Sequence, residues 1–226
     1  MAPPWRYRLP LLVVLALLPW PADAAATTLT GTAEVIDSDT IRLGDTTVRL
    51  ADIDAPELGQ HCDGPRELQR CGVVAAGFLA ERIEGEAVTC EVAGLDDYGR
   101  SIATCSHQGQ DLSAWLVAEG YALAFVKYSL RLVPLQEEAE AKLAGLWQAS
   151  LEPPWEYRAR RWQAAGQTAP NGCAIKGNIS QSSGDRIYHT PWSPYYERTR
   201  ITESKGERWF CSEGEALAAG WRPPRR

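Results

Sequence analysis

The sequence lacks Cys-x-x-Cys pairs and clusters of cysteine with histidine. Structural zinc sites usually need such paired ligands, so zinc is the less favoured use of its six cysteines. An even number of cysteines is typical of disulfide frameworks in oxidising compartments. Spacing favours three bridges, which pair Cys62 with Cys71, Cys90 with Cys105, and Cys173 with Cys211.

After residue 26 the sequence also lacks any apolar run near the roughly 20 residues that a membrane span needs. The earlier run Leu9–Leu18 follows Arg6 and Arg8 and precedes the small-residue site Ala22–Ala24. This order is typical of a cleaved secretory signal, and a membrane anchor is the alternative. We predict a signal peptide over residues 1–24, a secreted or periplasmic location, and no stable membrane insertion after cleavage.

Positive charge is not in excess, because 23 lysines and arginines face 29 acidic residues, for a net charge of −6. A nucleic-acid enzyme can still be acidic overall, but it needs positive charge where the phosphate backbone binds. The length left after signal cleavage is typical of one domain of ordinary size with a small appendage.

A β-hairpin is the strongest local prediction. Thr40–Leu43 and Thr46–Leu50 are rich in β-branched residues and flank Gly44-Asp45, a pair that suits a tight turn with a positive φ at the glycine. Such a turn places Leu43 opposite Thr46 and Thr40 opposite Arg49. Arg49 would then lie close to the residue that precedes the first strand.

Acidic groups flank the open end of this hairpin. Asp39 precedes the first strand, and Asp54 and Glu57 follow the second, where Pro56 prevents a simple continuation of the strand. The sequence therefore predicts three carboxylates and the Arg49 guanidinium at one rim.

Three motifs carry a resemblance to a known family. They are Asp37-Ser-Asp-Thr40, the segment Arg49-Leu-Ala-Asp-Ile-Asp-Ala-Pro-Glu57, and Asp96-Asp-Tyr-Gly-Arg100. Together they resemble the staphylococcal-nuclease (thermonuclease) family, in the same order and at similar intervals, over roughly Leu29 to Trp147. The resemblance implies a nuclease that hydrolyses phosphodiester bonds in DNA and RNA.

The resemblance also implies roles for single residues. Asp39, Asp54 and the main-chain carbonyl of Ala55 would bind Ca²⁺, which prefers oxygen ligands. Arg49 and Arg100 would bind the phosphate, and Glu57 would orient or deprotonate the attacking water. Lys127 and Tyr128 correspond to the family's nucleotide contacts. The alternatives are that the aspartates are ordinary turn residues and that the arginines form surface ion pairs.

Periodicity predicts the remaining elements. The predicted helices span Pro65–Ile83, Asp111–Glu119 and Leu132–Gly145, and the predicted strands span Ala87–Val92 and Ser101–Cys105. Short strands interleaved with about three helices agree with the fold class that the resemblance implies, an all-β or α+β protein with a five-stranded OB-fold barrel.

The C-terminal part is predicted to be separate from this barrel. Glu152–Trp162 can begin a helix whose arginines and aromatic residues either follow a nucleic-acid strand or pack back onto the barrel, and packing is favoured. A linker would follow in Ala164–Gly172. Cys173–Arg226 reads as a small β-rich module stabilised by a disulfide, in which His189 either fills the core or binds a ligand. The predicted divisions are 27–150, 151–172 and 173–226.

Two functions are open at this point. The first is an exported, Ca²⁺-dependent, monomeric nuclease whose C-terminal module has an unknown partner. The alternative is a non-catalytic binding protein, because chains with this tail also resemble thermonuclease-like proteins associated with succinoglycan (exopolysaccharide) biosynthesis. An intact set of acidic and basic site residues favours the enzyme.

Overall fold

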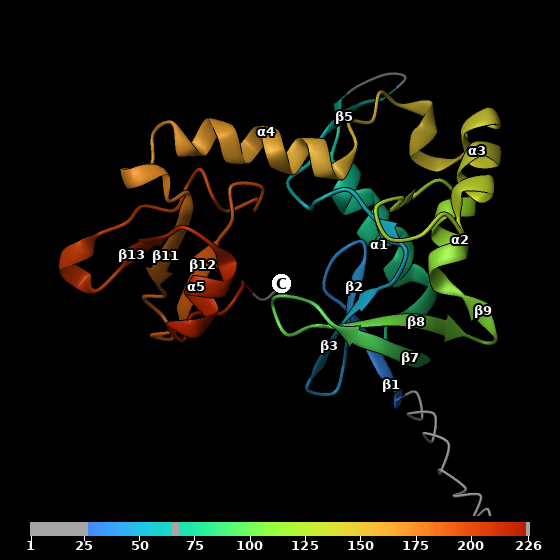
Figure 1. Cartoon of the computed structure of the whole chain (residues 1–226), viewed down its shortest axis with the longest axis horizontal. Helices are drawn as coiled ribbons and strands as arrows, with labels where there is room; N and C mark the ends of the chain where they lie inside the picture. The colour runs from blue at the N-terminus through green and yellow to red at the C-terminus, as the bar shows by residue number, and fades with distance from the viewer. Residues whose placement is uncertain (1–26, 65–67, 225–226) are drawn as a thin grey trace, which may run out of the picture.

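The structure, a computed structural model, describes residues 27–64 and 68–224 (Figure 1). The predicted signal peptide, residues 1–24, lies outside the described residues. A β-barrel with its helices lies on one side, and a smaller C-terminal part lies on the other (Figure 1). No helix in the described part of the chain is long and apolar enough to cross a membrane.

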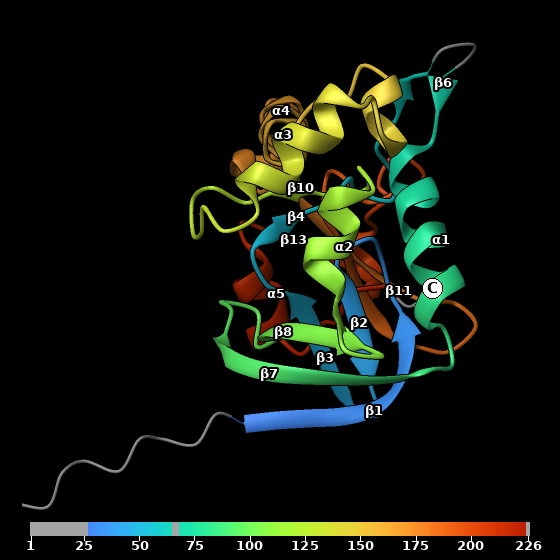
Figure 2. The ribbon, with the colours of Figure 1, turned by 90° about the vertical axis from the view of Figure 1, so that its right-hand side faces the viewer.

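The main sheet closes into a barrel. Its strands are β1 (Thr27–Val35), β2 (Thr40–Leu43), β3 (Thr46–Leu50), β7 (Ala87–Leu95), β8 (Ser101–His107) and β9 (Gln110–Asp111). Their order is β3-β2-β1-β7-β8-β9, and β3 also pairs in parallel with β8, which closes a ring of five strands. The five-stranded OB-fold prediction is confirmed. Figure 2 shows β1, β7 and β8 crossing beneath the helices.

The predicted hairpin forms with the predicted register. Leu43 pairs with Thr46 and Thr40 pairs with Arg49, and Gly44 has a φ of 59°. Ile41 and Val48, which pair across the hairpin, are fully buried in the barrel core. Because side chains alternate between the two faces of a sheet, a slip of one residue would expose these apolar groups.

Three helices cover the barrel: α1 (Cys71–Ile83), α2 (Leu112–Ala118) and α3 (Val133–Ala141). The prediction for α2 is accurate, since the Asp111 side chain caps it by accepting a hydrogen bond from the Ala114 amide. The predicted first helix, Pro65–Ile83, is wrong over residues 68–70, and its predicted start lies outside the described residues. The short strands β5 (Cys62–Asp63) and β6 (Leu68–Gln69) pair with each other there, so the helix begins only at Cys71.

The third helix is shorter than predicted. It ends at Ala141, and the chain turns through Leu143, which has a φ of 52°, into the 3₁₀ helix η1 (Gly145–Gln148). Gly145 also has a positive φ, and a side chain at this position would overlap the Glu119 carbonyl. The close packing of this turn against the end of α2 therefore stops the helix.

The C-terminal part has a separate apolar core. It contains α4 (Pro154–Gly166), η2 (Pro170–Gly172), β11 (Ile175–Ile179), β12 (Arg186–His189), η3 (Glu203–Lys205), β13 (Arg208–Phe210) and α5 (Glu213–Ala218). The strands form a sheet in the order β12-β11-β13. Phe210 and Trp221 meet edge to face in its core, with ring centroids 5.3 Å apart. Helix α4 continues to Gly166, so it occupies the first residues of the predicted linker.

Three disulfides join the cysteine pairs that the spacing in the sequence predicts. They are Cys62–Cys71, Cys90–Cys105 and Cys173–Cys211. Cys90 and Cys105 are directly opposite each other on β7 and β8. Cys173 and Cys211 are joined within the C-terminal part, whose small core has little apolar area to stabilise it.

We expect protein isolated from an oxidising compartment to contain no free thiol, because each described cysteine has a partner. Peptide mapping without reduction should recover Cys173 linked to Cys211, separate from the other two bridges. A C-terminal cysteine joined to a barrel cysteine would contradict this arrangement.

Candidate active site

Arg49 joins two carboxylates at the open end of the hairpin. Its Nη1 donates to Asp39 Oδ1 at 2.9 Å, and its Nη2 donates to Asp54 Oδ1 at 3.0 Å. Both aspartates are buried, with 5% of Asp39 and none of Asp54 exposed. The guanidinium therefore offsets part of the cost of burying these two charges.

Local backbone contacts fix the two aspartates. Asp39 Oδ2 accepts from the Ala55 amide at 3.2 Å, so the start of β2 is tied to the segment after Asp54. Asp54 lies in β4 (Ile53–Asp54), which pairs with β10 (Leu123–Ala124). The sequence motifs thus meet in space as the hairpin prediction required.

Glu57 is held by a close approach of backbone to helix α1. The Ser38 hydroxyl donates to the Pro56 carbonyl at 3.0 Å and the Gly72 carbonyl at 2.9 Å. A side chain at position 72 would overlap the Glu57 carbonyl. Glycine in the first turn of α1 therefore sets the position of the backbone that carries Glu57.

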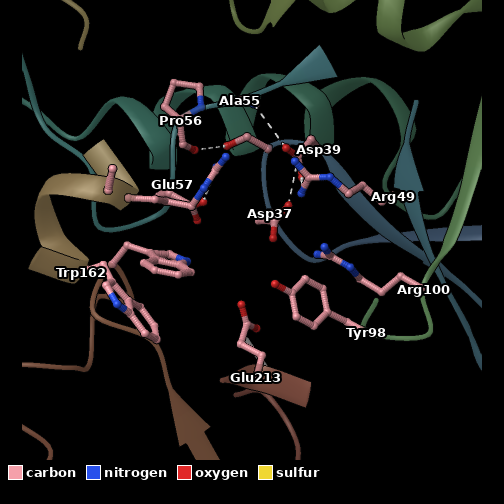
Figure 3. Close-up of a pocket in the computed structure, with 14 residues that line it drawn as sticks. Asp37, Asp39, Arg49, Ala55, Pro56, Glu57, Tyr98, Arg100, Trp162 and Glu213 are labelled. Carbon is pink, nitrogen blue, oxygen red and sulfur yellow. Dashed lines mark hydrogen bonds and ion pairs between the residues drawn. The ribbon is translucent and has the colours of Figure 1, made fainter. Parts of the chain in front are cut away.

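The hairpin between β7 and β8 places Arg100 beside Asp39 and Arg49. Asp96 Oδ1 accepts from the Tyr98 and Arg100 amides, each at 2.9 Å, and Asp96 Oδ2 accepts from Arg100 Nε at 2.6 Å. The turn is completed by Gly99, whose φ is 78°. Figure 3 shows the Arg100 guanidinium pointing into the pocket toward Asp37 and Arg49.

These residues line a pocket of about 390 Å³. The barrel contributes Asp37, Asp39, Arg49, Glu57, Tyr98 and Arg100, and the C-terminal part contributes Arg158, Trp162, Trp192 and Glu213. Figure 3 shows Trp162 and Glu213 across the pocket from the barrel residues. The C-terminal part thus forms one side of the site.

Arg158 was not predicted as a site residue. It donates from Nη2 to Asp54 Oδ2 at 2.6 Å and from Nη1 to Asp54 Oδ1 at 3.0 Å and Glu57 Oε1 at 2.9 Å. Its helix is anchored by the neighbouring Tyr157, whose hydroxyl donates to the Gly59 carbonyl at 2.9 Å. The only signal for this residue in the sequence is that its helix is rich in arginine. That composition does not identify which arginine faces the barrel.

Burial and charge act against each other on the acidic side chains. Burial favours a raised pKa for Asp39, but the charges of Arg49 and Arg100 outweigh burial and hold the pKa below its ordinary value. Burial raises the pKa of Asp37 to about 6, helped by the neighbouring Asp39. Burial also raises the pKa of Glu57 to about 8, although Arg158 opposes the change.

Lys127 and Tyr128 do not line this pocket. Tyr128 is 72% exposed, and the Lys127 ammonium lies over its ring at 5.3 Å from the centroid. Their role in substrate binding stays a prediction. The structure brings together Asp39, Arg49, Asp54, Ala55, Glu57 and Arg100, and it adds Arg158 and the aromatic residues of the C-terminal part.

A test of this geometry compares two glycines of helix α1. Gly72→Ala should lower the free energy of unfolding by about 1–3 kcal/mol, because its new methyl group would overlap the backbone of Glu57. Gly77→Ala is the matched control, since a methyl group there meets nothing, and alanine in a helix is better than glycine by about 0.5–1 kcal/mol. Urea unfolding measures both; equal stability of the two variants would contradict the close approach.

Comparisons with known proteins agree with this geometry. A model of the staphylococcal nuclease homologue family matches residues 47–149, and a model described as ArfC matches residues 158–223. The second match begins at Arg158 and covers most of the C-terminal part.

Three relatives show how far the likeness extends. The chain is 38% identical over 144 residues to the succinoglycan biosynthesis protein ExoI of Rhizobium meliloti (strain 1021). The aligned region covers 62% of this chain and 75% of that protein. The chain is 30% identical over 151 residues to a micrococcal nuclease of Shigella flexneri, covering 61% and 76%. It is 27% identical over 212 residues to the endonuclease YhcR of Bacillus subtilis (strain 168), covering 83% of this chain and 16% of that protein.

The barrel, the converging motifs and the relatives support the same assignment. ExoI and the micrococcal nuclease are each matched over about three quarters of their own length. The chain belongs to the staphylococcal nuclease homologue family.

Proposed function

We propose that this chain is an exported, Ca²⁺-dependent nuclease that hydrolyses phosphodiester bonds in DNA and RNA, and that it acts as a monomer. The observation that supports it most is the convergence of Arg49, Arg100 and Glu57 on one pocket, beside the paired carboxylates of Asp39 and Asp54. The planar guanidinium groups of Arg49 and Arg100 can each donate two hydrogen bonds to the oxygens of a negatively charged phosphodiester. The nuclease relatives support the same chemistry.

The donor set fits a hard cation. Asp39, Asp54 and the Ala55 carbonyl supply oxygen atoms, which Ca²⁺ prefers, and all three residues are buried. Asp39 and Ala55 line the pocket, and Asp54 lies behind them. In the described residues no group of three or more acidic, cysteine or histidine side chains forms a metal cluster, so this proposal depends on two carboxylates and a backbone oxygen. A bound Ca²⁺ would polarise a phosphate oxygen and offset its charge.

The side chains of this chain would divide the remaining work. Arg49 and Arg100 would donate hydrogen bonds to the non-bridging phosphate oxygens, where negative charge grows as phosphorus becomes five-coordinate. Glu57, in its ionised form, would accept a hydrogen bond from the attacking water and orient it or take its proton. Tyr98 lies beside Arg100, whose guanidinium carbon is 5.3 Å from the ring centroid, and helps to close the pocket.

We propose the same division of the chain that the sequence predicted. Residues 1–24 would be the signal peptide, 27–150 the catalytic barrel, 151–172 the connecting helix, and 173–226 the C-terminal module. Three disulfides support export to an oxidising compartment.

A second candidate is a non-catalytic role in exopolysaccharide biosynthesis. It is favoured by the 38% identity to ExoI, whose name assigns it to succinoglycan biosynthesis. The two arginines, Glu57 and the paired aspartates favour the enzyme, because a binding protein has no physical need for all five around one pocket.

Hydrolysis of single-stranded DNA and of RNA tests the proposal. Activity should require Ca²⁺, disappear in EGTA, and return when Ca²⁺ is restored. Asp54→Asn should lose both cation binding and at least about 100-fold in kcat, because it removes the charge that the cation would neutralise. Asp63→Asn is the control, since Asp63 is exposed on β5 and does not line the pocket. Purified wild-type protein that binds Ca²⁺ but cleaves neither substrate would favour the non-catalytic role.

Arg158 generates a separate prediction. Its two hydrogen bonds to Asp54 place a positive group where the cation would bind, so Arg158 and Ca²⁺ would compete for one carboxylate. Arg158→Gln should raise the affinity for Ca²⁺ by about tenfold or more, because close charge pairs couple by roughly 1.5–7 kcal/mol. Calorimetry measures this without any turnover.

Arg160→Gln is the matched control for this experiment. Arg160 lies on the same helix but pairs with Glu152, away from the pocket, with its Nη2 2.6 Å from Glu152 Oε2. Its variant should bind Ca²⁺ as the wild type does. Unchanged or weaker binding by Arg158→Gln would show that Arg158 does not compete with the cation.

A further inference from the structure

A second cavity, of about 630 Å³, continues from the proposed active site between the barrel and the C-terminal part. Asp37, Glu57, Tyr98, Arg100, Trp192 and Glu213 line both this cavity and the pocket that contains the arginines. We call this second cavity the aromatic cleft, after Tyr98 from the barrel and Tyr188, Trp192 and Tyr195 from the C-terminal part. Its volume is within the range of roughly 300–1,000 Å³ typical of small-molecule sites.

The wall that carries Trp192 is held firmly against the barrel. A Cβ at Gly59 would lie 2.6 Å from the Trp192 carbonyl oxygen, so glycine permits a close backbone contact there. Arg161 Nε donates to the Pro191 carbonyl at 2.9 Å, which ties the same loop to helix α4. The cleft is therefore a built feature of the fold, because both of its walls are fixed by specific contacts.

Aromatic rings in the cleft offer flat apolar surfaces next to a site suited to phosphate. Tyr98 is 40% exposed, and Trp192 and Tyr195 are half-buried. Bases of single-stranded nucleic acids stack on such rings with little dependence on sequence. A nucleotide whose phosphate met Arg49 and Arg100 could extend its base into this space.

The charges of the cleft favour the uncharged base and sugar of a nucleotide over a second phosphate. Glu213 lies in both cavities and accepts a hydrogen bond at 2.9 Å from the buried Tyr188 hydroxyl. Asp45 also lines the cleft. The arginines that line it are each paired with an acidic residue: Arg42 with Glu34, Arg100 with Asp96, and Arg222 with Asp185. A second phosphate would meet net negative charge here, whereas an uncharged base and its sugar would not.

We infer that the aromatic cleft binds the base and sugar of a nucleotide adjacent to the scissile phosphate of a single-stranded nucleic acid, with Trp192 as the stacking surface. This inference rests on the proposed function, which places the scissile phosphate at Arg49 and Arg100. It assigns the C-terminal part a role in binding substrate. A polysaccharide could also stack on aromatic rings, but the guanidinium groups in the adjoining pocket favour the nucleic acid.

Binding of two labelled strands to the full chain in EGTA tests this inference without any cleavage. One strand is oligothymidylate, and the other has the same length and phosphates but only abasic sites. Trp192→Ala should weaken the binding of oligothymidylate by about tenfold, because stacking contributes to each bound base. It should leave the affinity for the abasic strand unchanged, and Trp192→Phe should restore most of the loss.

Trp209→Ala is the matched control, because Trp209 lies on β13 and lines neither cavity. It should bind both strands as the wild type does. Equal affinities of the wild type and Trp192→Ala for oligothymidylate would overturn the inference. So would an equal loss for the two strands, or Trp192-dependent binding of succinoglycan fragments in place of DNA.

Hydrolysis of the same oligothymidylate in Ca²⁺ separates this inference from the proposed function. Absence of cleavage would reject the nuclease, while Trp192-dependent binding of thymidylate would still support the cleft. Cleavage with no dependence of strand affinity on Trp192 would reject the cleft and leave the nuclease standing.

Discussion

The bridge that Arg49 makes between Asp39 and Asp54 is the interaction on which the site depends. Both carboxylates are buried, and burying two such charges side by side would be strongly unfavourable without a cation between them. Arg49 can reach both only because β2 and β3 pair with Thr40 opposite Arg49. The register of one hairpin therefore places the guanidinium that joins these two carboxylates.

Closure of the barrel supports this bridge from the other side. Arg49 in β3 pairs in parallel with Ile102 in β8, two residues after Arg100. The same pairing that closes the barrel thus brings the Asp96–Arg100 turn next to the hairpin. Fold and site are linked here, because the strand contact that completes the core also places the second arginine.

The C-terminal part contributes side chains to the pocket of the barrel. Helix α4 is anchored by Tyr157 on the Gly59 carbonyl and directs Arg158 onto Asp54 and Glu57. Trp192 and Glu213 then form the far side of the pocket. Substrate and cation would both enter a site that is partly covered by residues outside the family match at 47–149.

Local signals in the sequence predicted much of this arrangement. Alternating β-branched residues around Gly44-Asp45 predicted the hairpin and its register, and motif spacing identified the converging carboxylates and arginines. Helix α1 begins later than its periodicity predicts, because Leu68 and Gln69 lie in strand β6, which pairs with β5. The sequence does not predict Arg158 as a site residue, because its partners are distant in sequence. Asp54 is 104 residues away and Glu57 is 101 residues away. No local period encodes such a contact.

The most direct test of the account is the hydrolysis of single-stranded DNA by Arg49→Lys. Lysine keeps the positive charge but cannot donate in two directions from a planar group, so it cannot bridge Asp39 and Asp54 and also bind a phosphate. We predict a fall in kcat of about 100-fold or more, with the barrel still folded by circular dichroism. A folded variant with a kcat near that of the wild type would contradict the central role of Arg49.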